Sequence, residues 1–234
     1  MNIVSQSIKA IRHVGTVCAL VAALIAIPVH ATTGGPAKQG PGELIASVAH
    51  QVLDELDARR DEMRRDPKKI RELVDKYMLP HFDTEYSARL VLARHWRDAT
   101  PEQRQRFVEA FYQSLLQNYG EALLDFTPDR LTIQPYRGSP SDKIATVRTD
   151  VRRDNGSRVP VNYSLRRTED GWKAYDVTIE GVSYVKSFQT DFAAEIDRKG
   201  LEAVIRRLES QVASGKFDKQ GGKQAATQAD GAKS

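Results

Sequence analysis

Apolar residues in the N-terminal part of the chain recur at helical spacing. The stretch PGELIASVAHQVLDELDARR, residues 41–60, carries them on one wide stripe, which predicts an amphipathic helix. The residues of this stripe are Leu44, Ile45, Val48, Val52, Leu53 and Leu56.

Capping residues predict two further short helices. Asp66 followed by Pro67 is typical of a helix start, and Pro80 is expected to end this second helix. Asp83 is expected to cap a third helix, because an aspartate side chain can accept a hydrogen bond from the first turn.

A capping box predicts a long fourth helix. It begins at Thr100 with the sequence TPEQ, which places proline at the first helical position, and it is expected to reach about Leu123. Spacing alone favours a core role for its apolar face over a ligand-binding role. That face consists of Phe107, Val108, Phe111, Tyr112, Leu115, Leu116 and Tyr119.

After residue 130 the pattern changes to the alternation of apolar and polar residues that predicts strands. The predicted strands are residues 131–134, 144–151, 159–166 and 172–179. The apolar face of the last strand is assigned to Tyr175, Val177 and Ile179. The opposite, polar face is assigned to Trp172, Ala174, Asp176 and Thr178.

Turn residues connect these strands directly. Residues 154–156, Asp-Asn-Gly, are a strong hairpin signal, and residues 169–171, Glu-Asp-Gly, form a second turn. Pro160 is expected at a strand end or edge, because proline donates no ladder hydrogen bond. Strands joined by tight turns form an antiparallel sheet.

The C-terminal part returns to helical spacing. Phe188, Phe192 and Ile196 lie four residues apart, and Gly200 is expected to end their helix. A last helix carries an apolar stripe that runs to Val212. The fold class is therefore α+β: an antiparallel meander of about four strands, covered on one face by N- and C-terminal helices.

The chain ends frame one domain. Residues 1–31 have a basic segment and an uncharged apolar run, followed at Val29-His30-Ala31 by a plausible signal-peptidase cleavage site with small or short side chains. Together these features predict a signal peptide. Residues 32–42 are expected to be a flexible lead-in, residues 43–212 the folded domain, and residues 213–234 a disordered tail. A retained membrane anchor is the alternative for the first segment, but its apolar run is short for a span.

Charge and cysteine content exclude several classes. The chain has 35 Lys and Arg against 31 Asp and Glu, and two of the bases, Lys9 and Arg12, fall in the predicted signal peptide. This balance does not predict nucleic-acid binding. The single cysteine also lies in the signal peptide, so the mature protein is expected to have no disulfide and no thiol nucleophile.

No catalytic constellation is evident. No two histidines have metal-binding spacing, and neither a nucleophile elbow nor a phosphate-binding glycine loop occurs. Asp176 and Glu180 are the best enzymatic candidates because they flank the end of the last strand, but solvated carboxylates on the polar face are the favoured interpretation. The residues thus offer no credible nucleophile, base or metal set, but a negative search alone does not exclude an enzyme, because catalytic residues scatter along a sequence.

Two segments resemble a known family. WKAYDVTIEGVSYVKSFQTDF, residues 172–192, and LPHFDTEYSARLVLARHWRDATPEQRQRFVEAFYQSLLQNYGEAL, residues 79–123, resemble the MlaC, or toluene-tolerance auxiliary, family. The similarity covers about residues 43–210, and the EGVS segment is its most specific part.

The resemblance implies a periplasmic phospholipid carrier that maintains the lipid asymmetry of the outer membrane. It implies an apolar cavity between sheet and helices that holds acyl chains. It also implies partners: a phospholipid ligand, an outer-membrane lipoprotein–porin complex, and an inner-membrane ABC transporter with an MCE-domain subunit. No nucleic-acid partner is expected. The family does no covalent chemistry, so the resemblance further implies a protein that is not an enzyme and needs neither cofactor nor metal.

With this resemblance, inward-facing apolar residues become candidates for lipid binding. A solid core uses the same residue types, so about half are expected to be plain core. The candidates are Phe107, Phe111, Leu115, Tyr119, Val147, Val151, Val161, Tyr163, Val177, Val182, Phe188, Phe192 and Ile196. Lys143 and Lys186 are weaker candidates for contact with a phosphate headgroup.

Three alternatives remain open. The ligand could be another lipid, such as a hopanoid. The protein could be a periplasmic adaptor with a solid core and no lipid. It could also be a hydrolase that uses Asp176 or Glu180.

Overall fold

The computed structural model describes residues 39–153 and 155–214. The predicted signal peptide, residues 32–38 of the lead-in and nearly all of the tail lie outside these residues, so those assignments stay predictions. Residues 41 and 42 of the lead-in belong to the first helix. Within the described residues, the helical and strand segments begin at Pro41 and end at Ser214.

The N-terminal helices follow the predicted caps. Helix α1 (Pro41–Arg65) is followed by α2 (Pro67–Leu73), and between them the Asp66 carboxylate accepts a 3.1 Å hydrogen bond from the Lys68 N–H. The second α-helix was expected to end at Pro80, but it ends at Leu73. The chain continues from there as a π-helical turn, η1 (Val74–Met78), and a 3-10 turn, η2 (Leu79–His81).

The middle helices confirm the predicted caps. The Asp83 carboxylate accepts a hydrogen bond from the Tyr86 N–H, and Thr100 and Gln103 form the reciprocal capping box. The long helix ends at Tyr119 and passes into 3-10 turns before Leu123, earlier than predicted. These elements are α3 (Thr84–Leu92), α4 (His95–Asp98), α5 (Pro101–Tyr119), η3 (Gly120–Asp125) and η4 (Pro128–Arg130).

The sheet is an antiparallel meander, as predicted, with strands in the order β1-β2-β3-β4-β5. The fifth strand, β5, has two residues and was not predicted, because so short a segment shows no alternation. The strands are β1 (Leu131–Ile133), β2 (Ile144–Arg152), β3 (Arg158–Thr168), β4 (Gly171–Ile179) and β5 (Val182–Ser183).

A bulge in β4 overturns the predicted faces of that strand. Leu165 of β3 pairs with Ala174, whereas the preceding Ser164 pairs with Asp176, so Tyr175 is an extra residue. The bulge reverses the alternation, and Trp172 and Ala174 are buried in the core, not on the polar face. Asp176, predicted to be solvated, is also buried.

Pro160 lies two residues into β3, opposite the turn that ends β4. Its carbonyl oxygen accepts a 3.0 Å hydrogen bond from the Glu180 N–H in that turn. The proline therefore faces the position where β4 has already ended, in agreement with its prediction at a strand end.

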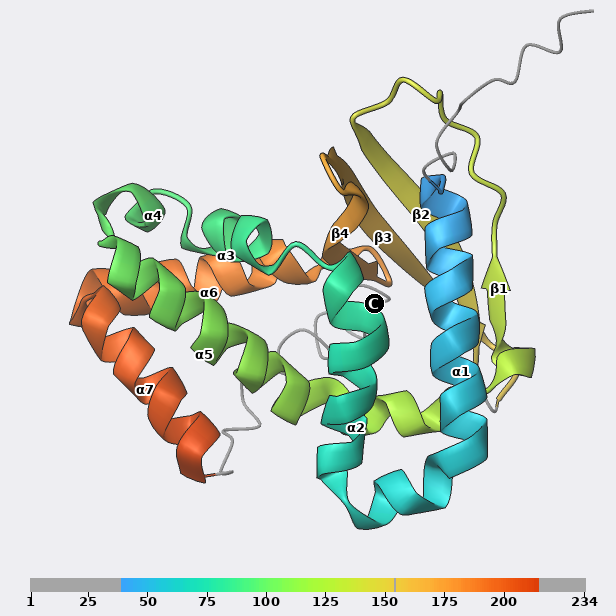
Figure 1. The fold of residues 1–234 in the computed structure, drawn as a ribbon. Coiled ribbons are helices and arrows are strands. Elements are labelled where there is room, and N and C mark those ends of the chain that lie inside the picture. Colours follow the sequence, from blue (N-terminus) through green and yellow to red (C-terminus); the bar gives the residue numbers. More distant parts are fainter. Residues whose placement is uncertain (1–38, 154, 215–234) are drawn as a thin grey trace, which may run out of the picture. The chain divides into compact units, whose positions relative to one another are not determined.

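The C-terminal helices are α6 (Tyr184–Lys199) and α7 (Leu201–Ser214), separated by Gly200 at a φ of 81°. The helices α3–α7 pack together, whereas α1 lies along the sheet (Figure 1). Helices from both ends of the chain contact the strands, α1 at β2 and α6 at β4. The α+β prediction is confirmed.

Candidate functional site

Aromatic side chains of α5 and α6 interlock edge to face. The ring centroids of Phe107 and Phe192 are 5.4 Å apart, and those of Phe111 and Phe188 are 5.2 Å apart. Phe107, Phe111 and Phe192 are buried, so this part of the predicted binding wall is solid core.

Toward the C-terminal end of α5 the packing becomes more open. Tyr119 contacts Tyr184 edge to face at 5.6 Å, and Tyr184 in turn contacts Phe188. These three residues are only partly buried. Burial raises the pKa of Tyr119 to about 12 and also raises the pKa of Tyr184.

Burial also decreases across one face of the sheet, from β2 to β4. Val147 pairs with Tyr163, which pairs with Val177, so these three side chains share one face of β2, β3 and β4. Val147 is fully buried, while Tyr163 and Val177 keep part of their surface accessible. Protein nevertheless surrounds the Tyr163 hydroxyl, and this burial raises its pKa.

The thirteen sequence-predicted residues divide into two groups. The fully buried group is Phe107, Phe111, Val147, Val161, Phe192 and Ile196. The partly exposed group is Leu115, Tyr119, Val151, Tyr163, Val177, Val182 and Phe188. A lipid-binding role for the second group stays a prediction.

The EGVS segment is a structural joint. Glu180 and Gly181 form the turn after β4, both at positive φ, and Val182 begins β5. Ser183 caps α6, because its hydroxyl accepts a 3.1 Å hydrogen bond from the Lys186 N–H. The segment thus sets the direction in which α6 leaves the sheet.

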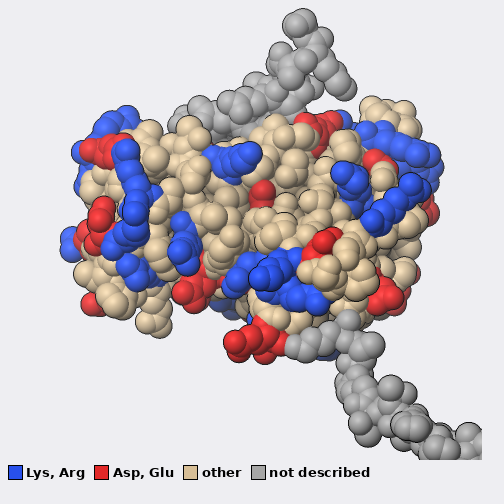
Figure 2. Space-filling view, turned by 90° about the horizontal axis from the view of Figure 1, so that it is seen from above, with Lys and Arg blue, Asp and Glu red and all other residues tan. Residues whose placement is uncertain are grey.

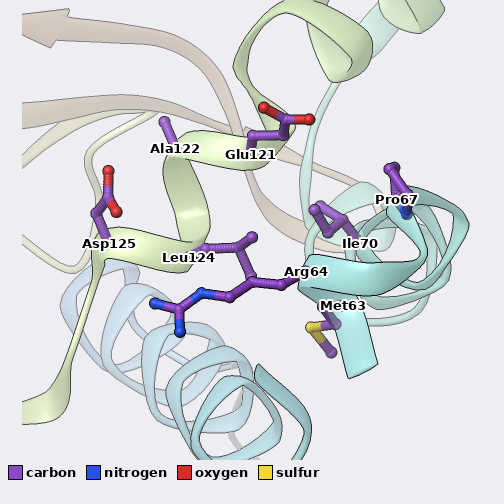
Figure 3. Close-up of a pocket in the computed structure, with 8 residues that line it drawn as sticks. All are labelled: Met63, Arg64, Pro67, Ile70, Glu121, Ala122, Leu124 and Asp125. Carbon is purple, nitrogen blue, oxygen red and sulfur yellow. The ribbon is translucent and has the colours of Figure 1, made fainter. Parts of the chain in front are cut away.

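Two hollows lie elsewhere, beside the C-terminal half of α1. One has a volume of about 680 Å³ and is lined by α1, η3, η4 and the end of β2. The other, about 400 Å³, lies between α1, α2 and η3 (Figure 3). They meet at Arg64, Leu124 and Asp125. Of the predicted wall residues only Val151 lines either hollow, and Lys143 and Lys186 line neither.

Sequence reasoning missed these hollows because their lining comes from four separate segments. One signal was available: Arg60 and Arg64 are four residues apart, which places them on one face of α1. The arginine pair at residues 152–153, at the end of a predicted strand, was a second signal.

Of the two carboxylates considered for catalysis, Asp176 is engaged in the fold. Asp176 accepts hydrogen bonds from the Ser183 hydroxyl at 2.6 Å and the Val185 N–H at 3.0 Å. Glu180 forms a 3.4 Å ion pair with Arg153. Within residues 39–153 and 155–214, no group of three or more His, Cys, Asp or Glu side chains is placed to hold a metal ion.

The face seen from above carries separate groups of Lys and Arg side chains with Asp and Glu side chains among them (Figure 2). None of the described helices combines the length and apolar character needed to cross a membrane.

Comparisons with known proteins agree with this architecture. The model of the MlaC protein family matches residues 46–210. The toluene tolerance protein ttg2D of Pseudomonas putida is 31% identical over 183 residues, 77% of this chain and 85% of that protein. The intermembrane phospholipid transport system binding protein MlaC of Haemophilus influenzae is 22% identical over 74% of this chain and 82% of its own length.

A solved structure extends the similarity to a ligand complex. It is that of a phospholipid-binding protein from Ralstonia solanacearum in complex with a phospholipid. The TM-score is 0.68 at 26% sequence identity, and the match covers 74% of this chain and 96% of that chain. With the family model spanning most of the described residues, this chain belongs to the MlaC protein family.

Proposed function

We propose that this chain is a periplasmic phospholipid carrier that moves lipid between the outer and inner membranes and so maintains outer-membrane lipid asymmetry. The observation that carries the proposal is the match over 96% of a relative that was solved with a phospholipid bound. The relative from Haemophilus influenzae is named for intermembrane phospholipid transport, which supports the same class of function.

The partly exposed wall residues supply a place for the acyl chains. The space that they border between the sheet and the helices α5 and α6 is here called the lumen. Its residues are Leu115, Tyr119, Val151, Tyr163, Val177, Val182 and Phe188. The buried members of the predicted set form the solid core behind it, as Phe107 and Phe192 do in α5 and α6.

Apolar burial is sufficient to hold a lipid. Each methylene removed from water contributes about 0.8 kcal/mol, so two acyl chains contribute more than about 10 kcal/mol. A bilayer offers a comparable gain, so net transport needs an external source of free energy. An inner-membrane ABC transporter with an MCE-domain subunit is the proposed source, and an outer-membrane lipoprotein–porin complex is the proposed partner at the other membrane.

Carriage of this kind involves no covalent chemistry, so the protein is proposed not to be an enzyme. The engagement of Asp176 in structural hydrogen bonds supports this over a hydrolase. The periplasmic location rests on the predicted signal peptide, residues 1–31.

Native mass spectrometry of protein purified without detergent tests the proposal. The expected spectrum contains a species heavier than the bare chain by one diacyl phospholipid, identified by lipid extraction. A hopanoid or another lipid in the extract would replace the proposed ligand. Protein that carries no lipid and takes none from phospholipid vesicles would contradict the proposal and favour an adaptor with a solid core.

A pair of tryptophan variants tests the position of the lumen. Val177→Trp places a large ring in the lumen and is expected to reduce lipid occupancy several-fold. Thr146→Trp adds the same ring on the exposed face of β2 and is expected to leave occupancy unchanged. Circular dichroism of both variants checks that the fold is retained. Equal occupancy in the two variants would place the lipid elsewhere.

A further inference from the structure

Arginine side chains gather around the larger hollow. Its lining includes Arg60, Arg64, Arg130, Arg152 and Arg153, but Asp125 is the one acidic residue among the described lining residues. We call this hollow, together with the smaller one that adjoins it at Arg64, the arginine groove.

Several of these arginines are already committed to the fold. The Arg60 guanidinium donates to the carbonyl oxygens of Leu124 and Phe126, the latter at 2.8 Å, and so fastens η3 to α1. Arg152 donates a 2.8 Å hydrogen bond to the carboxylate of Asp129. The contacts of Arg60 with two carbonyl oxygens fix one positive side chain in the wall of the groove.

Arg64 and Arg153 are held much less tightly. Arg64 pairs with Asp61 at 3.7 Å, and the two side chains are 57% and 83% exposed. Arg153 pairs with Glu180 at 3.4 Å and is 53% exposed. Exposed ion pairs at such distances contribute little, so both guanidinium groups have donors available for an anion.

Figure 3 shows how Arg64 lies in the groove. Its side chain extends past Leu124, and its guanidinium points away from the Glu121 carboxylate. The Asp125 carboxylate is turned away from that guanidinium in the same view. Among the described residues, the ion-pair partner of Arg64 is Asp61, and neither Glu121 nor Asp125 forms an ion pair with it.

The floor of the groove is apolar. Leu124, Phe126 and Val151 line it. Leu124 and Phe126 also pack against the cluster that contains Val52 of α1 and, at its edge, Tyr112 of α5. Val151 is also one of the residues proposed to border the lumen, so on that proposal the groove and the lumen share one wall residue.

We propose that the arginine groove binds the phosphate group of a phospholipid headgroup, with Arg64 and Arg153 as its mobile donors. This inference rests on the proposed carrier function. The planar guanidinium group matches the oxygens of a phosphate in a bidentate arrangement, and paired arginines are suited to it. The apolar floor suits the first methylenes of the lipid, which enter the lumen beyond Val151.

A competition between two lipids that share their acyl chains but differ in the phosphate-bearing headgroup tests this. Vesicles contain equal amounts of phosphatidylglycerol and of diacylglycerol with the same acyl chains, and native mass spectrometry reads which lipid the full-length protein takes up. The natural protein is expected to favour phosphatidylglycerol. In the double variant Arg64→Gln/Arg153→Gln, loss of two charge-assisted contacts is expected to reduce that preference about tenfold or more, while total lipid uptake is retained.

The matched control is Arg148→Gln/Arg198→Gln. It removes the same charge from exposed positions on β2 and α6 that do not line the groove. Its preference is expected to stay within about twofold of the natural protein, because exposed charges away from the ligand contribute little. An equal loss of preference in both double variants would overturn the proposal, since it would indicate a general charge effect.

Calorimetric titration with inorganic phosphate distinguishes the two possible sources of the anion, a lipid headgroup and free phosphate. Lipid uptake without phosphate preference would overturn the groove proposal while leaving the carrier function standing. If the natural protein takes up no lipid, the carrier function fails. In that case, phosphate binding that is lost in Arg64→Gln/Arg153→Gln would assign the groove to free phosphate and overturn the headgroup assignment. If the natural protein bound no phosphate either, the groove would be no phosphate site of any kind.

Discussion

The hydroxyl group of Ser183 donates a 2.6 Å hydrogen bond to the carboxylate of Asp176 and accepts one of 3.1 Å from the Lys186 N–H. The other Asp176 oxygen accepts from the Val185 N–H at 3.0 Å. One buried carboxylate on β4 thus anchors the first turn of α6. The EGVS segment, the most specific part of the family resemblance, therefore includes a structural link between sheet and helix.

Removing this link is expected to destabilise the protein. Asp176→Ala leaves the Val185 N–H buried without its acceptor and should lower the free energy of unfolding by about 2–3 kcal/mol. Ser183→Ala removes a helix cap and should cost about 1 kcal/mol. Urea denaturation measures both.

Asp170→Ala is the control, because Asp170 is exposed in the β3–β4 turn and should change stability by less than about 0.5 kcal/mol. An Asp176→Ala protein as stable as the natural one would show that the link is not structural. Loss of an enzymatic turnover in that variant, without loss of stability, would revive the hydrolase alternative.

A second carboxylate joins the sheet to the helices. Asp83 accepts from the Tyr86 N–H at 3.0 Å and from Arg166 at 2.6 Å, and its side chain is only 13% exposed. Asp83→Ala loses a cap and a charge-assisted hydrogen bond and should lower the unfolding free energy by about 2–4 kcal/mol. Asp83→Asn keeps an acceptor for the cap and should cost about half as much.

The comparison for this pair is Asp129→Ala. Asp129 also pairs with an arginine, Arg152, at 2.8 Å, but its side chain is 67% exposed, so its loss should cost at most about 1 kcal/mol. If urea denaturation gave the same loss of unfolding free energy for Asp83→Ala and Asp129→Ala, burial of the Asp83 carboxylate would not account for its contribution to stability.

Local signals in the sequence predicted most of the fold. Caps at Asp66, Asp83 and Thr100 are read from short motifs because the side chain and the N–H group that it accepts from lie within three residues of each other. The meander followed from turn residues for the same reason. The bulge at Tyr175 could not be read, because its extra residue is defined only by the pairing of β4 with β3.

The candidate site was predicted less completely. Spacing places Phe107 and Leu115 on the same face of one helix, but only tertiary packing buries Phe107 and leaves Leu115 partly exposed. The arginine groove escaped prediction because Arg64 and Arg153 meet only after β2 has paired with β3 and η3 has packed on α1. The π-helical turn that starts at Val74 has no signal in the sequence that we can identify.

Truncating two phenylalanines of the same cluster should distinguish core from lumen. Phe107 is fully buried, so Phe107→Ala should cost about 3–5 kcal/mol through lost transfer free energy and a new cavity. Phe188 is partly exposed, so Phe188→Ala adds less cavity and should cost less than about 2 kcal/mol. Urea denaturation of lipid-free protein gives both values, and similar losses at the two positions would contradict a lumen beside Phe188.

Stability should fall on mild acidification because of His81. Burial, with a smaller effect of the Lys173 charge, lowers the pKa of His81 below its ordinary value of 6.5. The folded state therefore binds this proton less well than the unfolded chain, and the contribution to stability is fully present above pH 6.5 and is lost as the pH falls through the lowered pKa. His81→Asn should remove this part of the pH dependence.

The window between about pH 6.5 and 4.5 isolates the histidine effect from two of the carboxylates. Hydrogen bonds from Arg106 lower the pKa of Glu202 and of Glu209 below 4.5, so the stability that these acids contribute is lost only at lower pH. His50→Asn changes an exposed histidine on α1 and should leave the slope of stability against pH as in the natural protein. Urea denaturation across this window gives the slope, and a His81→Asn protein with the natural slope would show that other groups set the acid response.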